Sequence, residues 1–463
     1  MSSMEAIDFE SVQDDEQADA LPQAHQPLRI ALLGYRSKPF CGGQGIYIQF
    51  LSTALCDYGH QVDVISGPPY PNLDPRVRLI KIPSLELFEQ FNWIPRTSPK
   101  NLLDSTNRFE YVSKLTGGFP EPETFGRRVV QYFRDNGCQY DIVHDNQSLC
   151  YGLLELQNMG VPLVTTIHHP ITRDRRIELK SATGPWARLL VRRWHNFLSM
   201  QQKVVNKLNH VVTVSEHSRK DISDDFNRSE QRIDLVYNGI DTKQFKPIKG
   251  IERKPFRLMA MASADVPLKG LEFLLGALAI LQKDYPELDL LLVGQPKPGG
   301  PTEKLINKLG IADKIQFVSG ISTEQLVQYY VEATIAVTAS LYEGFGLPIG
   351  EAMACGVPVV SSDGGALPEV VGDAGLVVPC GDAQALATAI GRLLDNPLLR
   401  IKLGEKGRQR ILETFSWTVA AGEMTHLYQR VLNPSKLEAA NTKIAPIAEQ
   451  AIESDEVALA CKP

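Results

Sequence analysis

The sequence feature that most constrains the fold is a short apolar run that recurs along the chain, followed each time by a turn and a helical stretch. Residues 28–34 read LRIALLG, and residues 288–293 read LDLLLV before Gly294. Continuous apolar runs, rather than alternating ones, are typical of strands buried on both faces of a parallel sheet. The first run is followed by a predicted helix over 46–58 and a strand over 62–66, which together form one βαβ unit. The sequence therefore predicts an α/β fold.

The same rhythm appears twice in the 463 residues, a length that suggests two or three domains. We set the boundary near Gly250, which gives one Rossmann-like domain over 28–250 and a second over 251–415. Residues 1–27, acidic and rich in Gln and Ala, are predicted to be a disordered tail, and residues 434–463 a mobile one. Further strands are predicted at 140–144, 162–167, 210–214 and 233–237 in the first domain, and at 256–261, 315–318, 357–361 and 375–378 in the second.

Bulk composition excludes several classes of protein. The net charge of −6 gives no indication of nucleic acid binding. The seven cysteines are scattered without a C-x-x-C pair, so neither a disulfide framework nor a zinc site is expected. No apolar run approaches the about 20 residues of a membrane span, and no Lys or Arg precedes Arg29, unlike the basic start of a signal peptide. These features predict a cytoplasmic protein.

The most informative stretch is residues 340–365, SLYEGFGLPIGEAMACGVPVVSSDGG. A predicted strand over 335–337 leads into a Gly-containing turn, and Pro348 suits the first turn of a helix. Such a turn presents free backbone N–H groups and the positive end of the helix dipole to a phosphate. Glu343 and Glu351 frame it and can face one ligand. The structural alternative is that Glu343 caps the turn and Glu351 is an ordinary first-turn acid.

The string EGFGLPIGEAMACGVPVV resembles the signature of the retaining family-4 glycosyltransferases, in which two glutamates separated by seven residues embrace a nucleotide-sugar. The resemblance covers about residues 28–432 and implies the GT-B architecture, two Rossmann-like domains facing across a cleft. It also implies that a helix over 416–432 crosses back onto the first domain. By the same resemblance Glu343 bonds sugar hydroxyls and Glu351 holds the ribose. The amides of Gly344, Phe345, Gly346 and Leu347 would meet the sugar and the β-phosphate.

A second Gly-rich loop, with Gly42, Gly43 and Gly45, follows the first predicted strand. It lies where open α/β sheets bind ligands, but GGQGIY does not complete a dinucleotide fingerprint, and a purely structural turn is an equal alternative. Similar enzymes place a Gly-Gly pair here against the donor diphosphate and the acceptor, so Gly42 and Gly43 are candidate donor-binding residues.

Two further residues, His168 and Lys269, carry over from the resemblance. The strand over 162–167 ends in TIH, and the family's histidine at this point touches the donor sugar, which selects His168 and not His169. Two satisfied imidazoles at a strand exit are the alternative. Lys269 matches a lysine that faces the donor diphosphate, and the base is expected to stack near Gly320 and Ile321. The sequence departs from the family six residues before that lysine, where Ser263 replaces an arginine.

Other segments concern the acceptor. Residues 68–125 show no clear period and are predicted to be an irregular insertion that leaves the sheet. Arginines at 173–176 form a cationic cluster that could replace the arginine missing at Ser263. The stripe over 186–208 predicts a basic amphipathic helix, either simply solvated or in contact with an anionic lipid or an acceptor phosphate.

The resemblance implies a retaining glycosyltransferase that moves a sugar from a UDP-, GDP- or ADP-linked donor to a glycan, lipid-linked or small-molecule acceptor. No D-x-D follows a predicted strand, so no metal and no other cofactor is expected. Peripheral membrane contact and the oligomeric state stay open, and a hinge is expected over 238–250. The alternatives are a nucleotide-sugar 2-epimerase, a non-catalytic nucleotide-sugar-binding subunit and a glycan phosphorylase.

Overall fold

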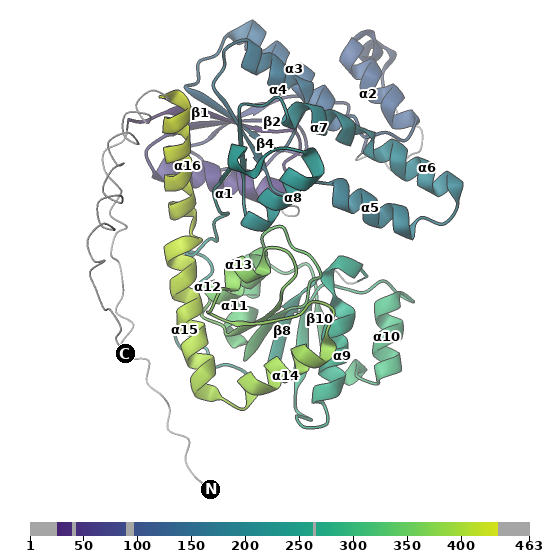
Figure 1. Cartoon of the computed structure of the whole chain (residues 1–463), viewed down its shortest axis with the longest axis vertical. Helices are drawn as coiled ribbons and strands as arrows, with labels where there is room; N and C mark the ends of the chain where they lie inside the picture. Colours follow the sequence, from purple (N-terminus) through teal and green to yellow (C-terminus); the bar gives the residue numbers. More distant parts are fainter. Residues whose placement is uncertain (1–25, 39–42, 89–96, 263–264, 434–463) are drawn as a thin grey trace, which may run out of the picture.

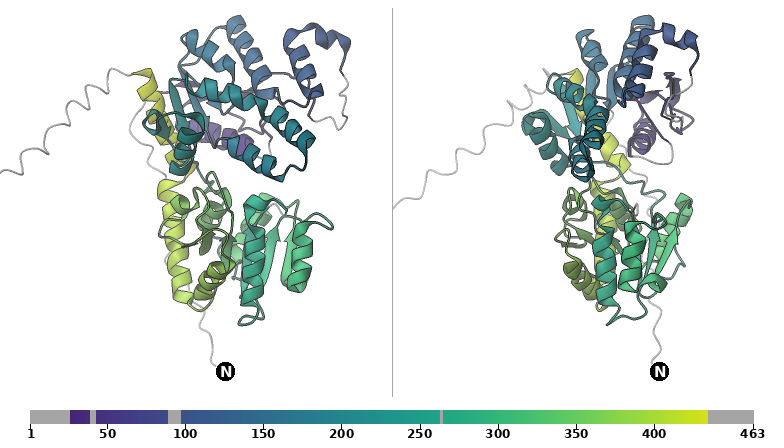
Figure 2. Two further views of the ribbon diagram at one scale, coloured as in Figure 1. Left: turned by 45° about the vertical axis from the view of Figure 1, so that its right-hand side comes forward. Right: turned by 90° about the vertical axis from the view of Figure 1, so that its right-hand side faces the viewer.

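The structure is a computed structural model that describes residues 26–38, 43–88, 97–262 and 265–433. Two parallel sheets, one in each half of the chain, form two lobes stacked end to end (Figures 1 and 2). The predicted α/β fold with two sheets is confirmed. Gly42, Ser263 and the two predicted tails, apart from residues 26 and 27, lie outside the described residues.

The first sheet has seven parallel strands in the order β3-β2-β1-β4-β5-β6-β7. Its central strands carry almost no exposed side chains, which explains why their sequences are continuously apolar. The strands are β1 (Arg29–Gly34), β2 (Gln61–Ser66), β3 (Arg78–Lys81), β4 (Ile142–Asn146), β5 (Leu163–Ile167), β6 (His210–Thr213) and β7 (Ile233–Leu235).

Helices cover both faces of this sheet. One face packs against apolar residues of α3, α4, α7 and α8, including Phe133, Leu153 and Ile222. The other face packs against α1 and the last helix of the chain. The helices are α1 (Gly43–Asp57), α2 (Ser105–Leu115), α3 (Glu121–Asn136), α4 (Tyr151–Asn158), α5 (Thr172–Ser181), α6 (Pro185–Trp194), α7 (Leu198–Val205) and α8 (Glu216–Phe226).

The second sheet has six parallel strands in the order β10-β9-β8-β11-β12-β13. They are β8 (Arg257–Met261), β9 (Asp289–Val293), β10 (Ile315–Val318), β11 (Ile335–Thr338), β12 (Val359–Ser362) and β13 (Leu376–Val378). Its helices are α9 (Leu271–Leu281), α10 (Pro301–Leu309), α11 (Thr323–Glu332), α12 (Leu347–Ala354), α13 (Leu367–Val371), α14 (Ala383–Leu394) and α15 (Pro397–Thr414). Apolar residues of α9 and α14 pack on one face, and those of α11 and α12 on the other.

The last helix, α16 (Trp417–Leu432), returns to the first half of the chain and lies beside α1 (Figure 1). The rings of Trp417 and Phe50 stack with centroids 5.9 Å apart. Deeper in, His60 Nε2 and Thr425 Oγ1 lie 2.9 Å apart, and His144 Nδ1 lies 2.6 Å from the hydroxyl of Tyr428. These buried contacts make α16 part of the first domain's core.

The prediction of an irregular insertion over 68–125 is wrong. Strand β3 pairs in parallel with β2 and extends the sheet, α2 lies wholly inside the segment, and α3 begins in it. The four-residue strand has too few residues to show a period, because Leu79 and Ile80 are flanked by Arg78 and Lys81. The apolar face of α3 becomes regular only after Phe125, beyond the end of the segment.

The predicted helical stripe over 186–208 is interrupted. A 3-10 turn at His195–Phe197 separates α6 from α7. None of the α6 side chains is buried, whereas α7 buries Leu198, Met200 and Val204 against the sheet. The stripe is therefore two helices with different surroundings, one exposed and one in the core.

Candidate active site between the two domains

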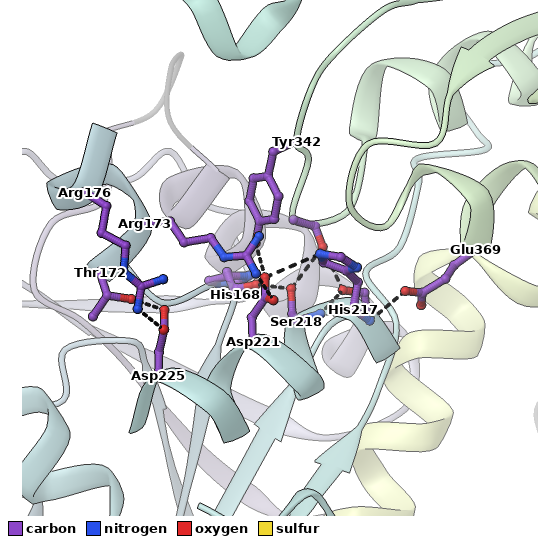
Figure 3. Close-up of polar contacts among 12 residues, drawn as sticks. His168, Thr172, Arg173, Arg176, His217, Ser218, Asp221, Asp225, Tyr342 and Glu369 are labelled. Atoms are coloured by element: carbon purple, nitrogen blue, oxygen red, sulfur yellow. Dashed lines mark hydrogen bonds and ion pairs between the residues drawn. The ribbon is translucent and has the colours of Figure 1, made fainter. Parts of the chain in front are cut away.

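The carboxyl ends of the two sheets carry loops that meet between the lobes, as the close-up in Figure 3 shows for their polar side chains. The carbonyl of Gly344 accepts hydrogen bonds from Ser215 Oγ at 2.8 Å and from Ser218 Oγ at 3.2 Å. Ser218 Oγ also donates to the carbonyl of His168 at 2.8 Å. The end of β5 and the turn after β11 therefore meet, and they bring His168 to the segment that carries Glu343.

Glu343 is held within its own domain. Its Oε1 accepts hydrogen bonds from Lys269 Nζ at 2.7 Å and from Ser340 Oγ at 2.8 Å. Its backbone carbonyl accepts from the amide of Ala366 at 2.9 Å. A Cβ on Gly365 would lie 2.2 Å from that carbonyl, and Gly365 has a φ of +70°, so this position requires glycine. Glu343 and Lys269, both predicted site residues, are thus brought together.

Lys269 reaches the site because of a tight turn before α9. A 3-10 turn at Pro267–Lys269 ends at Gly270, whose φ is +57°. A Cβ on Gly270 would lie 2.0 Å from the carbonyl of Ala339, at the end of the β11 segment. The two loops therefore touch at the backbone, and this contact fixes where the ammonium lies. The Lys269 side chain is 30% exposed, so its ammonium remains accessible to a ligand.

The amides at the start of α12 are the expected anion-binding groups. Gly346 precedes the helix with a φ of +100°, and Pro348 lies in its first turn. The Phe345 side chain is buried, with its ring centroid 5.8 Å from that of Phe415. Only the backbone of Phe345 is therefore available to a ligand. The first-turn N–H groups and the helix dipole favour a phosphate at this point.

Glu351 lies one turn into α12 in a much less polar place. Its Oε2 is 3.4 Å from the hydroxyl of Tyr330, which also donates to the carbonyl of Pro348 at 3.1 Å. Burial raises the pKa of the Glu351 carboxyl to about 7, although the Tyr330 hydroxyl opposes this by stabilising the ionised form. Glu343 and Glu351 therefore have different partners and different charge environments.

His168 is neutral and oriented. Burial lowers the pKa of its imidazole to about 3. The Asn146 amide nitrogen donates to the carbonyl of Gln44 at 3.0 Å, so its oxygen faces His168 Nε2 at 2.7 Å and Nε2 carries the hydrogen. The Tyr47 ring packs edge-on against the imidazole, with centroids 4.6 Å apart. The lone pair of the neutral ring is consequently on Nδ1.

Asn146 and Gln147 were missed by the sequence reasoning. Gln147 accepts from the amide of His168 at 2.7 Å and donates to the carbonyl of His169 at 2.8 Å. Its φ of +55° is unusual for a residue that is not glycine. The available signal was the polar string His144–Ser148 at the end of a buried strand.

The remaining predicted residues line the same edges of the sheets. Gly43 is the first residue of α1, and a Cβ there would meet nothing within 4 Å, so open space lies beside it. Ile321 follows β10, three strands from β11 in the sheet. Three strand spacings are about 14 Å. Ile321 is thus well removed from Glu343.

Two of the three arginines in the cationic cluster at 173–176 are already paired with carboxylates. Arg173 is hydrogen-bonded to Asp221, and Arg176 to Asp225. Both carboxylates lie on α8, so these arginines join α5 to α8 inside the first domain. Among the residues that the structure describes, only Arg175 of the three has no carboxylate partner.

Within the described ranges of the chain, no cluster of three or more His, Cys, Asp or Glu side chains is arranged to bind a metal ion. None of the helices in these ranges combines the length and the apolar character needed to cross a membrane.

The two domains and their contacts define a class of protein. The sucrose-phosphate synthase of Thermosynechococcus elongatus superposes with a TM-score of 0.65 at 26% identity, covering 88% of this chain and all of that one. Such neighbours identify the fold as that of the GT-B glycosyltransferases, as predicted.

Sequence comparison identifies the family. The model described as Glycosyltransferase Family 4 matches residues 41–244, and the one described as Glycosyl transferases group 1 matches residues 242–410. An "MMP alpha-(1->4)-mannosyltransferase" of Mycolicibacterium hassiacum is 46% identical over 88% of this chain and 98% of its own. A "D-inositol 3-phosphate glycosyltransferase 2" of Catenulispora acidiphila is 27% identical over 87% and 95%. The chain belongs to the group 1, family-4 glycosyltransferases, and it is a glycosyltransferase as the sequence predicted.

Proposed function

We propose that the chain transfers a mannosyl residue from a nucleoside-diphosphate mannose to a mannoside acceptor, with retention of anomeric configuration and without a metal ion. The observation that carries the proposal is the Lys269–Glu343 pair beside the Gly344 contact with the His168 segment. This arrangement joins a cation for a leaving diphosphate to a carboxylate for sugar hydroxyls. The choice of mannose rests on the relative that is 46% identical and is named as a mannosyltransferase.

The proposed donor site is formed by groups of both domains. The carboxylate of Glu343 accepts hydrogen bonds from sugar hydroxyls, and the amides from Gly344 to Leu347 bind the sugar and the β-phosphate. The carboxylate of Glu351 accepts hydrogen bonds from the ribose, the base stacks near Ile321, and Gly43 at the start of α1 faces the diphosphate from the first domain. Burial of a phosphate against amides and an ammonium is favourable because each contact is charge-assisted.

The reaction breaks the bond between the anomeric carbon and the β-phosphate oxygen. Negative charge then develops on the diphosphate, and Lys269 turns from Glu343 to stabilise it. The acceptor hydroxyl attacks the same face of the sugar, and its proton passes to the departing phosphate oxygen. A new glycosidic bond and a nucleoside diphosphate result. His168, neutral and fixed by Asn146, accepts a hydrogen bond from a sugar hydroxyl at Nδ1 and orients the ring.

The test uses a donor panel of GDP-, UDP- and ADP-mannose with UDP-glucose for comparison, and an α-mannoside as acceptor. We expect one mannosyl donor to give a lengthened glycan whose new bond is α-configured, at a rate that EDTA does not change. Glu343→Ala should abolish transfer, while Glu413→Ala on the exposed face of α15 serves as a matched control. Transfer of glucose alone would overturn the choice of sugar, and no transfer from any donor would overturn the site.

The exposed face of α6 supports a second proposal, peripheral contact with an anionic lipid surface. Trp186 and Leu189 are 70% and 52% exposed, and Arg188 and Arg192 lie on the same helix. Exposed apolar and basic residues together are typical of interfacial helices. Co-sedimentation with phosphatidylserine vesicles should fall on Trp186→Ser substitution. Equal sedimentation of both proteins, or none with either, would contradict this contact.

A further inference from the structure

One helix of the first domain, α8, makes contacts with the residues on both sides of Glu343 in the second domain. Figure 3 shows its Asp221 beside Tyr342 and its His217 beside Glu369. On one side, Ser215 and Ser218 donate to the carbonyl of Gly344. On the other, the hydroxyl of Tyr342 donates to Asp221 Oδ2 at 2.8 Å. The backbone around Glu343 is therefore held from across the domain boundary, whereas the Glu343 side chain is held within its own domain.

Asp221 is built to receive Tyr342. Its side chain is 2% exposed, and Oδ1 is already occupied by the guanidinium of Arg173. That leaves Oδ2 for the phenol, and the Arg173 guanidinium carbon also lies 4.8 Å from the centre of the Tyr342 ring. His217 Nε2 lies 3.6 Å from the same carboxylate. A buried carboxylate with charged partners makes a stronger hydrogen bond to a phenol than a neutral acceptor would.

The N-terminus of α8 adds a second attachment. The amides of Glu216 and His217 donate to the two oxygens of Glu369 on α13, both at 2.7 Å. A carboxylate is favoured at that position by the helix dipole. Helix α8 therefore cannot shift along its axis relative to the second domain without breaking these bonds, and Asp221 lies at a fixed place beside the turn.

We propose that Asp221 is a positioning residue: through Tyr342 it holds the turn that carries Glu343, and it thereby makes the geometry of the donor site depend on contact between the two domains. The proposal rests on the proposed function, in which Glu343 bonds the donor sugar. Asp221 itself contacts neither donor nor acceptor. Apart from Gly43, the groups proposed to hold the nucleotide are Lys269, Glu351 and the α12 amides, which lie within the second domain. Most of the nucleotide's binding therefore does not require this contact.

The test compares Tyr342→Phe with Asp225→Asn. The first substitution removes only the phenolic oxygen and leaves Arg173 bound to Asp221. The second changes a buried carboxylate one turn along the same helix, whose partners Arg176 and Thr172 are in the first domain. We expect Tyr342→Phe to lower kcat about tenfold, the effect of losing one hydrogen bond to a charged group. Affinity for GDP, UDP and ADP by calorimetry should stay within about twofold.

Asp221→Asn also removes the charge that pairs with Arg173, so it should lower kcat at least as much as Tyr342→Phe. The double variant should be no worse than Asp221→Asn alone, because the hydrogen bond between the two side chains cannot be lost twice. Wild-type kcat in Tyr342→Phe would overturn the proposal, and so would an equal loss in Asp225→Asn or a parallel loss of nucleotide affinity. If Asp221→Asn does not fold, Tyr342→Phe carries the test alone. Glu343→Ala distinguishes failure of this proposal from failure of the proposed function. If Glu343→Ala retains full transfer, the proposed function itself is wrong.

Discussion

Glu343, in the turn after β11, and Glu351, one turn into α12, lie eight residues apart but have very different surroundings. Glu343 faces an ammonium 2.7 Å away and a serine hydroxyl. Glu351 has one phenol 3.4 Å away and is only partly exposed. Burial raises the pKa of Glu351 to about 7.

One motif therefore supplies two kinds of carboxylate. Glu343 is paired with the ammonium of Lys269, and a ligand phosphate can compete for that cation. The ionised form of Glu351 is destabilised until polar hydroxyl groups such as those of a ribose arrive. Glu343 is therefore suited to a reaction in which charge moves between groups. Glu351 is suited to binding the ribose.

The largest expected effect comes from Glu343→Gln. The amide keeps the size of the side chain but neither neutralises Lys269 nor accepts two strong hydrogen bonds from sugar hydroxyls. We expect kcat to fall about hundredfold, the usual cost of losing one oriented polar group at a reacting centre. Steady-state kinetics of the proposed mannosyl transfer measure this fall in kcat. A loss of less than about threefold would show that the two carboxylates do not differ in this way.

A smaller effect is expected on the pH dependence of nucleotide affinity. Glu351 is mostly protonated below pH 7, and its ionised form is the better acceptor for ribose hydroxyls. Affinity for the nucleoside diphosphate should therefore rise about tenfold between pH 6 and pH 8. Calorimetry at several pH values checks this. Glu351→Gln provides the control, because it keeps the titration of the phosphates and should lose this component.

As the pH rises, the free energy of unfolding should fall, whereas nucleotide affinity should rise. The pKa of Glu351 is raised above the unfolded value, so its contribution to stability is present below pH 4.5 and is lost as the pH rises to about 7. Relative to Glu351→Gln, the wild type should lose about 1 kcal/mol over that range, after allowance for the partial exposure of the carboxyl. Ligand-free thermal melts of both proteins measure the change. A constant difference between the two would show that the carboxyl is not perturbed.

The smallest effect is expected from Tyr330→Phe. Its hydroxyl lies 3.4 Å from Glu351 and stabilises the ionised carboxylate, so removing it should raise the pKa of Glu351 slightly. The midpoint of the affinity profile should move upward, and affinity at pH 7 should fall about twofold. A downward shift of the midpoint would mean that the phenol stabilises the protonated form instead.

Much of the fold could be predicted from the sequence because buried parallel strands are continuously apolar and end at glycine or polar residues. The predicted strand over 162–167 differs from β5 only at its first residue. Strand β3 was missed because only two apolar residues, Leu79 and Ile80, lie between basic ones on an edge strand. Edge strands bury little, so their sequence carries little signal.

Part of the candidate site could be predicted because its residues lie in one contiguous motif. Glu343, the α12 amides and Glu351 are neighbours in sequence, and Lys269 follows from resemblance. Asn146, Gln147 and Asp221 could not be found in this way. Their roles depend on partners more than twenty residues away, for example Tyr342 for Asp221, and such pairing exists only once the chain has folded.

The return of α16 to the first domain has a consequence for the order in which the protein is made. The core beside α1 contains Ile48 and Leu51 together with Ala421, Leu427 and Tyr428. During synthesis the first domain emerges from the ribosome long before those last residues do. The apolar face that α16 covers therefore stays exposed while the whole second domain is translated. The same holds for the imidazoles of His60 and His144, which α16 contacts. The first domain to be synthesised is therefore the last to be completed.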